Sequence, residues 1–176
     1  MGLENDKHNI LITGRPGVGK TTLIVKLAEA LHRFHPVGFY TAEIREQNVR
    51  KGFELISLCG RRRILSHVEI QSPYRVGKYG VDVSGFERFL DEIKLVRSAA
   101  PVIIIDEIGK MECLSDSFIE LIIELLDSPS PVIATIARIG GGIIERIKQR
   151  DDVRIIEITP ANRNRMAEII HKLLEF

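Results

Sequence analysis

One short segment constrains this chain more than any other. Residues 14–21 read G-x-x-x-x-G-K-T, between an apolar run at residues 9–13 and an amphipathic stretch at residues 20–34. Glycines let backbone N–H groups come close to a ligand. A strand, such a loop and the N-terminus of a helix together form a cradle for phosphate oxygens. The chain is therefore expected to fold around a strand–loop–helix unit that binds phosphates.

Two residue types in this loop have specific expected tasks. Lys20 supplies a positive charge for the β- and γ-phosphates, and Thr21 offers a hydroxyl to Mg²⁺. Lys20 is therefore a predicted catalytic residue, and Thr21 is a predicted metal ligand. The expected nucleotide-binding residues of the loop are Gly14, Arg15, Pro16, Gly17, Val18, Gly19, Lys20, Thr21 and Thr22.

A second motif supplies the carboxylates that such a loop requires. Residues 101–106 form an apolar run that ends in Asp106, a pattern typical of a central strand covered on both faces. An aspartate at the carboxyl end of that strand would reach the ligand crevice and hold Mg²⁺, directly or through water. Glu107 follows it and could orient and polarise a water for attack on the γ-phosphorus, with the charge of its neighbour tuning its basicity.

Apolar runs alternate with helical patterns along the chain, which predicts a three-layer α/β fold with a mostly parallel central sheet. The Asp106–Glu107 pair favours the P-loop NTPase type with an additional strand and a catalytic glutamate, the RecA-like type. In that type the additional strand lies between the loop strand and the Asp106 strand. Residues 1–176 are expected to form a single domain. Other strands are predicted at 37–44, 52–59, 67–71, 80–83, 131–137 and 153–158, and other helices at 84–98, 117–126, 143–149 and 160–175, with Ser84 and Thr159 as N-caps.

Charge and composition exclude several other classes of protein. The 25 Lys and Arg nearly balance the 24 Asp and Glu, so the chain lacks the basic excess of a domain that grips nucleic acid. Cys59 and Cys113 are too few for a disulfide framework and lack metal-ligand spacing. No apolar run is long enough to span a membrane, and residues 1–9 are polar, unlike a secretory signal. We expect a cytoplasmic monomer with no membrane partner and no nucleic-acid partner.

Four segments together resemble one protein family. They are residues 14–22 (GRPGVGKTT), 38–46 (GFYTAEIRE), 76–79 (VGKY) and 106–112 (DEIGKME). In this order they are similar to the signature blocks of the thermostable nucleoside-triphosphatase family, which includes the cancer-related nucleoside-triphosphatases. Many families share the loop, whereas the second and fourth segments are far more specific.

The resemblance implies a small Mg²⁺-dependent hydrolase that cleaves ATP, GTP and other nucleoside triphosphates to diphosphate and phosphate. It also implies loose base selectivity and slow turnover. Because members resemble nucleotide kinases in parts, transfer of the γ-phosphate to a small acceptor remains an alternative. A third possibility is a switch that binds nucleic acid or protein. The arginine run at residues 61–63 is its main support, although three arginines between strands more often form a solvated turn.

Residues outside the two main motifs have candidate roles beside plain structural ones. Lys110 could neutralise charge on the γ-phosphate as a further catalytic group, or be a solvated loop lysine. Glu43 and Arg45 alternate on a predicted strand, so they share a face. They could lie beside an acceptor or water pocket, or form an ion pair at an edge strand.

The last third of the chain holds three more candidates. Arg138 precedes three glycines and could be an arginine finger on a mobile loop, or an ordinary surface arginine. Asn162 and Arg163 lie at the start of the last predicted helix. Asn162 could hydrogen-bond a base edge, and Arg163 could stack on the base; helix capping is the alternative.

Overall fold

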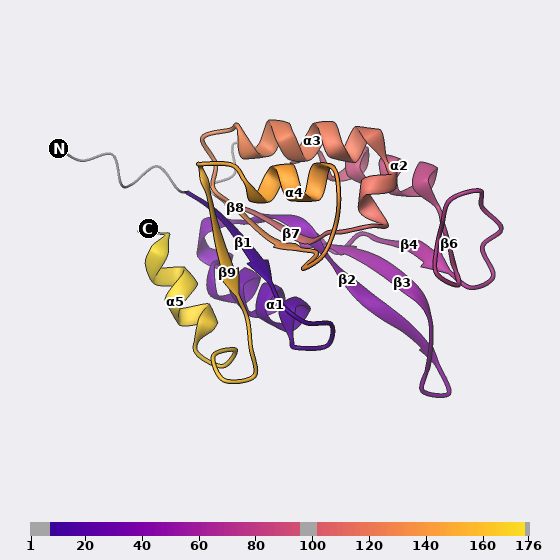
Figure 1. Ribbon diagram of the computed structural model, residues 1–176, viewed down its shortest axis with the longest axis horizontal. Helices are drawn as coiled ribbons and strands as arrows, with labels where there is room; N and C mark the ends of the chain where they lie inside the picture. Colours follow the sequence, from indigo (N-terminus) through magenta and orange to yellow (C-terminus); the bar gives the residue numbers. More distant parts are fainter. Residues whose placement is uncertain (1–7, 96–101, 175–176) are drawn as a thin grey trace.

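The computed structural model describes residues 8–95 and 102–174, whose strands form one mixed sheet (Figure 1). Its nine strands lie in the order β5-β6-β4-β3-β2-β7-β8-β1-β9. The strands are β1 (Asn9–Thr13), β2 (Val37–Glu46), β3 (Val49–Ser57), β4 (Arg62–His67), β5 (Arg75–Val76), β6 (Tyr79–Val81), β7 (Ile103–Ile108), β8 (Val132–Ile136) and β9 (Val153–Glu157). The α-helices are α1 (Lys20–Ala30), α2 (Val83–Ile93), α3 (Asp116–Leu126), α4 (Ile143–Lys148) and α5 (Met166–Leu173), and the short 3₁₀ helices include η1 (His32–Phe34) and η3 (Glu112–Leu114).

The half of the sheet that carries the phosphate loop is parallel. Strands β2, β7, β8, β1 and β9 pair in parallel, and both Leu11 of β1 and Ile105 of β7 are in register with Ala134 of β8. Strand β8 therefore lies between the loop strand and the Asp106 strand, which confirms the predicted additional strand. The central position also explains the unbroken apolar run of β7, since helices cover both of its faces.

The other half of the sheet is an antiparallel extension that the alternation of elements did not predict. Strand β3 folds back on β2 through Gln47 and Asn48, which both have positive φ (47° and 65°). Two such residues give a hairpin whose twist matches that of its strands. Strands β4, β6 and β5 follow, each antiparallel to its neighbour, and the β2–β3 ribbon reaches beyond the helical layers (Figure 1).

The arginine run at residues 61–63 differs from its prediction as a solvated turn. Arg62 and Arg63 lie on β4. Arg62 forms a bidentate pair with Glu54 on β3, while Arg61 and Arg63 both pair with Glu92 on α2. Two carboxylates of neighbouring elements therefore offset most of the charge of these three arginines. The strand predicted at 67–71 is also wrong, because β4 already ends at His67.

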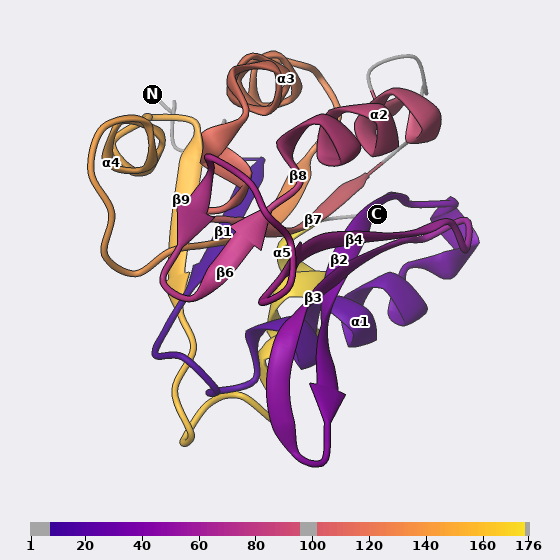
Figure 2. The same cartoon turned by 90° about the vertical axis from the view of Figure 1, so that its right-hand side faces the viewer.

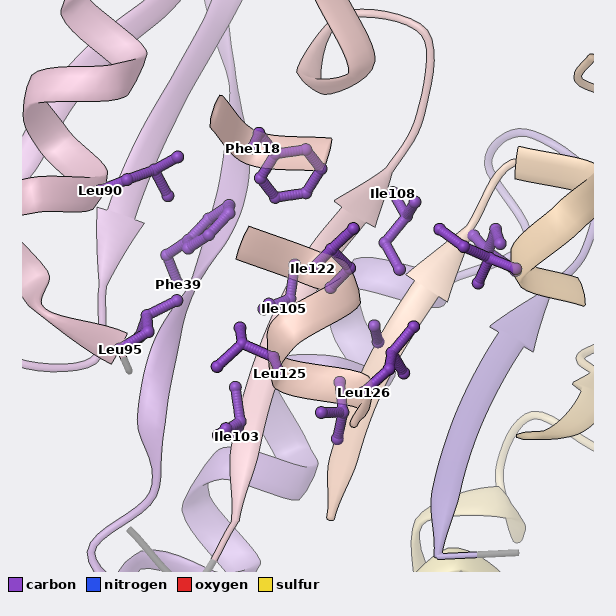
Figure 3. Close-up of a cluster of buried hydrophobic side chains, with 14 of the residues drawn as sticks. Phe39, Leu90, Leu95, Ile103, Ile105, Ile108, Phe118, Ile122, Leu125 and Leu126 are labelled. Carbon is purple, nitrogen blue, oxygen red and sulfur yellow. The ribbon is translucent and has the colours of Figure 1, made fainter. Parts of the chain in front are cut away.

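Helices cover both faces of the sheet and make three layers (Figures 1 and 2). Helices α2, α3 and α4 lie on one face, and α1 and α5 lie on the other. Side chains alternate between the two cores along each strand: Ile103 and Ile105 of β7 pack with α2 and α3, whereas Ile104 packs with α1. Figure 3 shows the first of these cores, where Phe118 and Ile122 of α3 lie over the sheet.

Two predicted helix starts are wrong for local reasons. Asp82 caps α2 in place of Ser84, because its Oδ1 accepts a hydrogen bond from the Gly85 amide at 2.9 Å. Helix α5 begins at Met166, because turns occupy residues 160–165. The predicted helix end at Ser98 lies outside the described residues. Among the helices of residues 8–95 and 102–174, none has the length and apolar character needed to cross a membrane.

Candidate active site

The phosphate loop joins β1 to α1 at the carboxyl edge of the parallel strands. Gly17 and Gly19 have φ angles of 74° and 110°, which side chains rarely allow. No side chain caps the first turn of α1, so its amide groups are left for a ligand. The Lys20 ammonium donates to the Gly14 and Arg15 carbonyl oxygens at 3.3 and 3.5 Å. Lys20 is thus folded over the loop that it is predicted to serve.

Asp106 is the polar centre of the site and is only 1% exposed. Its Oδ2 accepts hydrogen bonds from the Thr21 hydroxyl at 2.7 Å and the Thr41 hydroxyl at 3.1 Å. Its Oδ1 accepts from the Thr135 hydroxyl at 2.5 Å. Loop, β2, β7 and β8 therefore converge on one carboxylate, and the structure brings together the two predicted metal ligands, Thr21 and Asp106.

Thr41 and Thr135 were missed as site residues by the sequence reasoning. Thr135 is a polar residue within the buried apolar strand β8, which was an available signal because buried hydroxyls need a partner. Thr41 lies within the family segment at 38–46, but its contact depends on the pairing of β2 with β7. Periodicity along the chain does not indicate that pairing.

Hydroxyl and carboxylate oxygens are hard ligands, so the Thr21–Asp106 pair suits Mg²⁺. Within the described ranges, no group of three or more His, Cys, Asp or Glu side chains could by itself hold a metal ion. A Mg²⁺ ion typically keeps waters and takes phosphate oxygens beside one or two protein ligands. The donor set here matches that pattern.

The carboxyl groups of Glu107 and Glu112 lie near Asp106, and both approach Gly109. A Cβ at Gly109 would lie 3.0 Å from Glu112 Oε2 and 3.3 Å from Glu107 Cδ. Burial raises the pKa of Glu107, with a further rise from the charge of Asp106 that Lys20 partly offsets. Glu112 is 5% exposed, and burial, followed by the charge of Glu107, raises its pKa to about 8. Burial and the neighbouring carboxylates thus favour the neutral form of Glu112, a property that its sequence position did not reveal.

Three cavities surround the loop. The Glu107 cavity measures about 390 Å³ and is lined by Lys20, Phe53, Leu65, Val76, Glu107 and Glu112, among others. The Thr21 cavity measures about 570 Å³ and includes Thr21, Tyr40, Thr41, Glu43 and Arg50. The Arg163 cavity measures about 410 Å³ and includes Arg15, Pro16, Val18, Arg138, Pro160 and Arg163. Each predicted loop residue from Gly14 to Thr22 lines at least one of them.

The predicted cationic candidates lie at different places around these cavities. Lys110 and Arg138 are exposed and line the Glu107 cavity, and Arg138 also reaches the Arg163 cavity. Arg45 does not line the Thr21 cavity; it bonds Glu43 at 2.7 Å. Glu43 itself lines that cavity.

The structure gives the segment at 76–79 a physical role. The Tyr79 hydroxyl accepts a hydrogen bond from Arg50 Nε at 3.0 Å, and Arg50 also donates to Glu43 at 2.9 Å. Hydrogen bonds from Arg50 and then Arg45 lower the pKa of Glu43 despite its partial burial. Tyr79 thereby holds an arginine that borders the Thr21 cavity, and sequence reasoning had not singled out Arg50.

The two residues predicted to contact a base differ in their surroundings. Arg163 lines the Arg163 cavity and donates to the Val18 carbonyl at 3.4 Å. The Asn162 amide group donates to the Glu157 carbonyl at 3.0 Å, and its oxygen accepts from the Thr159 amide at 2.8 Å. Asn162 thus stabilises the turn before α5, and contact with a base stays a prediction for both residues.

A family model described as NTPase matches residues 9–171, which is nearly the whole chain. The chain belongs to this NTPase family. A nucleoside-triphosphatase THEP1 of Thermotoga maritima is 46% identical over 168 residues, covering 95% of each chain. A human cancer-related nucleoside-triphosphatase is 38% identical over 177 residues, covering 90% of this chain and 92% of the human one.

The similarity to members of the NTPase family also holds for the three-dimensional structure. The crystal structure of THEP1 from Aquifex aeolicus superposes with a TM-score of 0.84 at 38% identity, covering 96% of this chain and 99% of that one. The solution structure of the human protein has a TM-score of 0.80. The family resemblance and the P-loop α/β fold inferred from the sequence are both confirmed.

Proposed function

We propose that the protein hydrolyses nucleoside triphosphates to nucleoside diphosphate and phosphate with the help of Mg²⁺. The observation that carries the proposal is the hydrogen bond of 2.7 Å between Thr21 and Asp106, with Glu107 next in the chain. It joins the end of the phosphate loop to a carboxylate at the end of a central strand. The names of the relatives, which are nucleoside-triphosphatases, support the same activity.

Each residue of the site has a proposed role that follows from its position. The loop amides and Lys20 bind and orient the triphosphate. When bound by Thr21 and Asp106, Mg²⁺ would neutralise charge on the β- and γ-phosphates. Glu107 lines the cavity beside Lys20 and accepts the proton of the attacking water. Burial makes Glu107 a stronger base than an exposed glutamate, because it raises the pKa.

The Arg163 cavity is our proposed nucleobase site. It combines the guanidinium groups of Arg15, Arg138 and Arg163 with the apolar side chains of Val18 and Ile158. Cations and apolar groups contact the faces of aromatic rings, which all bases share. Such a site favours broad base specificity over the selection of one base. Arg138 borders both the base site and the Glu107 cavity, so it is the arginine that we propose as a finger.

Two substitutions test this function. Glu107→Gln keeps the shape of the site but loses the base, so it is expected to bind MgATP and to release almost no phosphate. Lys20→Ala is expected to weaken both binding and turnover. Phosphate release by Glu107→Gln at the wild-type rate would show that Glu107 is not the base. Normal turnover by Lys20→Ala would overturn the proposed site as a whole.

We also propose that residues 1–176 form one domain that acts as a cytoplasmic monomer without a nucleic-acid partner. The single sheet supports the first point, because it includes strands from Asn9 to Glu157. The pairing of Arg61, Arg62 and Arg63 with Glu54 and Glu92 supports the last, since these two carboxylates offset most of that positive charge. Size-exclusion chromatography with light scattering tests the monomer.

A further inference from the structure

The Glu107 cavity would receive the γ-phosphate on its phosphate-loop side, and it is still larger than one attacking water requires. A single water, with a share of liquid volume of about 30 Å³, is the only second reactant of a hydrolase. The cavity beside Glu107 measures about 390 Å³, and pockets for small organic molecules begin at about 300 Å³. Lys20 and Gly14 form its wall on the side of the phosphate loop. A molecule held there would therefore lie against the γ-phosphate.

The remaining walls are mostly apolar. They come from three separate parts of the fold: the antiparallel extension, the segment after β7 and the loop after β8. Leu65 is buried at the inner end, whereas Ile139 is 79% exposed. Apolar walls do not help to bind a water molecule. They do favour binding of an apolar ligand, because the ligand removes apolar surface from water in proportion to the area that it buries. The apolar wall residues are Phe53, Leu65, Val76, Met111, Ala137 and Ile139.

The charged groups of the cavity are arranged unevenly. Lys110 and Arg138 are exposed, so they belong to its outer part. The buried polar group is Glu112, and Glu107 is the half-buried group that lines the cavity together with Lys20. Lys20 is the cation on the phosphate-loop side, where the γ-phosphate would occupy it. Among the residues that the structure describes, no cation beyond Lys20, Lys110 and Arg138 lines the cavity, so none is left beside the apolar walls for an acceptor that carries phosphate. An uncharged molecule that offers one hydroxyl suits a carboxylate beside an otherwise apolar chamber.

We propose that the Glu107 cavity is an acceptor site for a small uncharged alcohol with a compact apolar body, to which the protein transfers the γ-phosphoryl group. The proposal rests on the proposed function, since it uses the same bound triphosphate. The alcohol oxygen forms a bond to the γ-phosphorus while the bond from that phosphorus to the β–γ bridging oxygen breaks. The nucleoside diphosphate leaves with the electron pair, and the hydroxyl proton passes to Glu107. Water takes the same path when the cavity holds no alcohol.

The test follows the phosphoryl group from γ-labelled MgATP in the presence of defined probes. The alcohols are benzyl alcohol, 2-phenylethanol and cyclohexanol, and glycerol, uridine and AMP form the polar set. If the cavity does not position the alcohol, alcohol and water compete equally for the γ-phosphoryl group. The ratio of alkyl phosphate to free phosphate then equals the ratio of the alcohol concentration to the water concentration. A positioned acceptor is expected to exceed that proportion by at least about a hundredfold, given the effective molarities of well-oriented groups. Label appearing in free phosphate alone, or on the polar set instead of the alcohols, would overturn the proposal.

Substitutions at the rim assign any transfer to this cavity. Val76→Phe places a ring into the space from strand β5, so it is expected to lower the ratio of transfer to hydrolysis at least about tenfold, as for a misplaced reactant. Val76→Ala keeps the space open and should retain most of the ratio. The matched control is Val49→Phe, on the antiparallel extension but outside the cavity and 52% exposed, which should leave the ratio unchanged. Equal ratios in Val76→Phe and Val49→Phe would place the transfer elsewhere and overturn the assignment.

Phosphate release without any alcohol is measured in the same series. If it is absent, the proposed hydrolysis itself fails. If it is normal and no probe accepts the label, only the acceptor site fails, and the two results are thus distinguishable. Saturation-transfer NMR on the complex with Mg²⁺ and a non-hydrolysable ATP analogue gives a second readout. Binding of an alcohol that slows phosphate release without being phosphorylated would contradict its role as acceptor.

Discussion

Replacing Glu112 by glutamine should stabilise the protein progressively as the pH rises. The carboxyl group has an ordinary pKa of 4.5 and a pKa of about 8 in the fold, chiefly because it is buried. Between these two values the folded chain holds a proton that the unfolded chain has lost. The free energy of unfolding of the wild type therefore falls with rising pH, by at most about 1.4 kcal/mol for each unit. The contribution of protonated Glu112 to the free energy of unfolding is fully present below about pH 4.5, and it is lost as the pH rises through about 8.

Glutamine has nearly the same shape as the neutral acid but does not titrate. The difference in unfolding free energy, Glu112→Gln minus wild type, should grow by about 1 kcal/mol per unit from pH 5 to 8 and then level off. Urea unfolding at fixed ionic strength, without Mg²⁺ or nucleotide, measures it. Glu29→Gln, at an exposed position on α1, is the control and should show no such trend.

The charge of Glu107 is the second cause of the raised pKa of Glu112. The pH trend should therefore be weaker in a Glu107→Gln background. A difference between Glu112→Gln and wild type that stays constant from pH 5 to 8 would refute the buried neutral acid.

Three further predictions concern packing, metal binding and the base site. Gly38→Ala should cost at least about 3 kcal/mol in urea unfolding, because a Cβ on β2 would overlap the backbone of β7; Gly60→Ala, also at positive φ but in open space, should cost only about 1 kcal/mol. Thr41→Val should weaken Mg²⁺ binding to the complex with a non-hydrolysable ATP analogue about tenfold in calorimetry, since supporting hydroxyls orient metal ligands, and unchanged affinity would show that Thr41 is not needed. Arg163→Ala should raise the Kd for ATP and GTP about equally, whereas Asn162→Ala should chiefly lower the melting temperature; a loss confined to one base would contradict the broad base site.

The parts of the site that lie close together in the sequence were predictable. The loop and the Asp106–Glu107 pair depend on local spacing. The unbroken apolar run before Asp106 predicted that this residue follows a central strand, and it lies in the second half of β7, which continues to Ile108. The type of motif predicted one additional strand between the loop strand and the Asp106 strand, and β8 occupies that place. The motif did not show which segment of the chain would supply it.

Features that depend on contacts between distant segments were not predictable. Thr41 and Thr135 meet Asp106 only because β2 and β8 flank β7. The high pKa of Glu112 depends on burial, which a charged residue after a strand does not indicate. The antiparallel extension was hidden because its strands have the same residue types as parallel ones.

Two sequence patterns that are typical of helix starts were misleading here, because other polar side chains nearby form the hydrogen bonds instead. A serine before Glu87 resembled a capping box, yet Asp82 makes the cap two residues earlier. Thr159-Pro160 resembled a helix start, but Asn162 uses its side chain to hold a turn there instead. Several polar residues could cap either helix, and the tertiary position of the chain decides which one does.

Hydrolysis of MgATP in water enriched in oxygen-18 tests the central claim most directly. If the loop, Asp106 and Glu107 direct a water to the γ-phosphorus, the isotope must appear in the released phosphate and be absent from ADP. Mass spectrometry after a single turnover distinguishes the two products. Isotope in ADP, or in AMP and pyrophosphate, would mean that another bond is cleaved and would contradict this account.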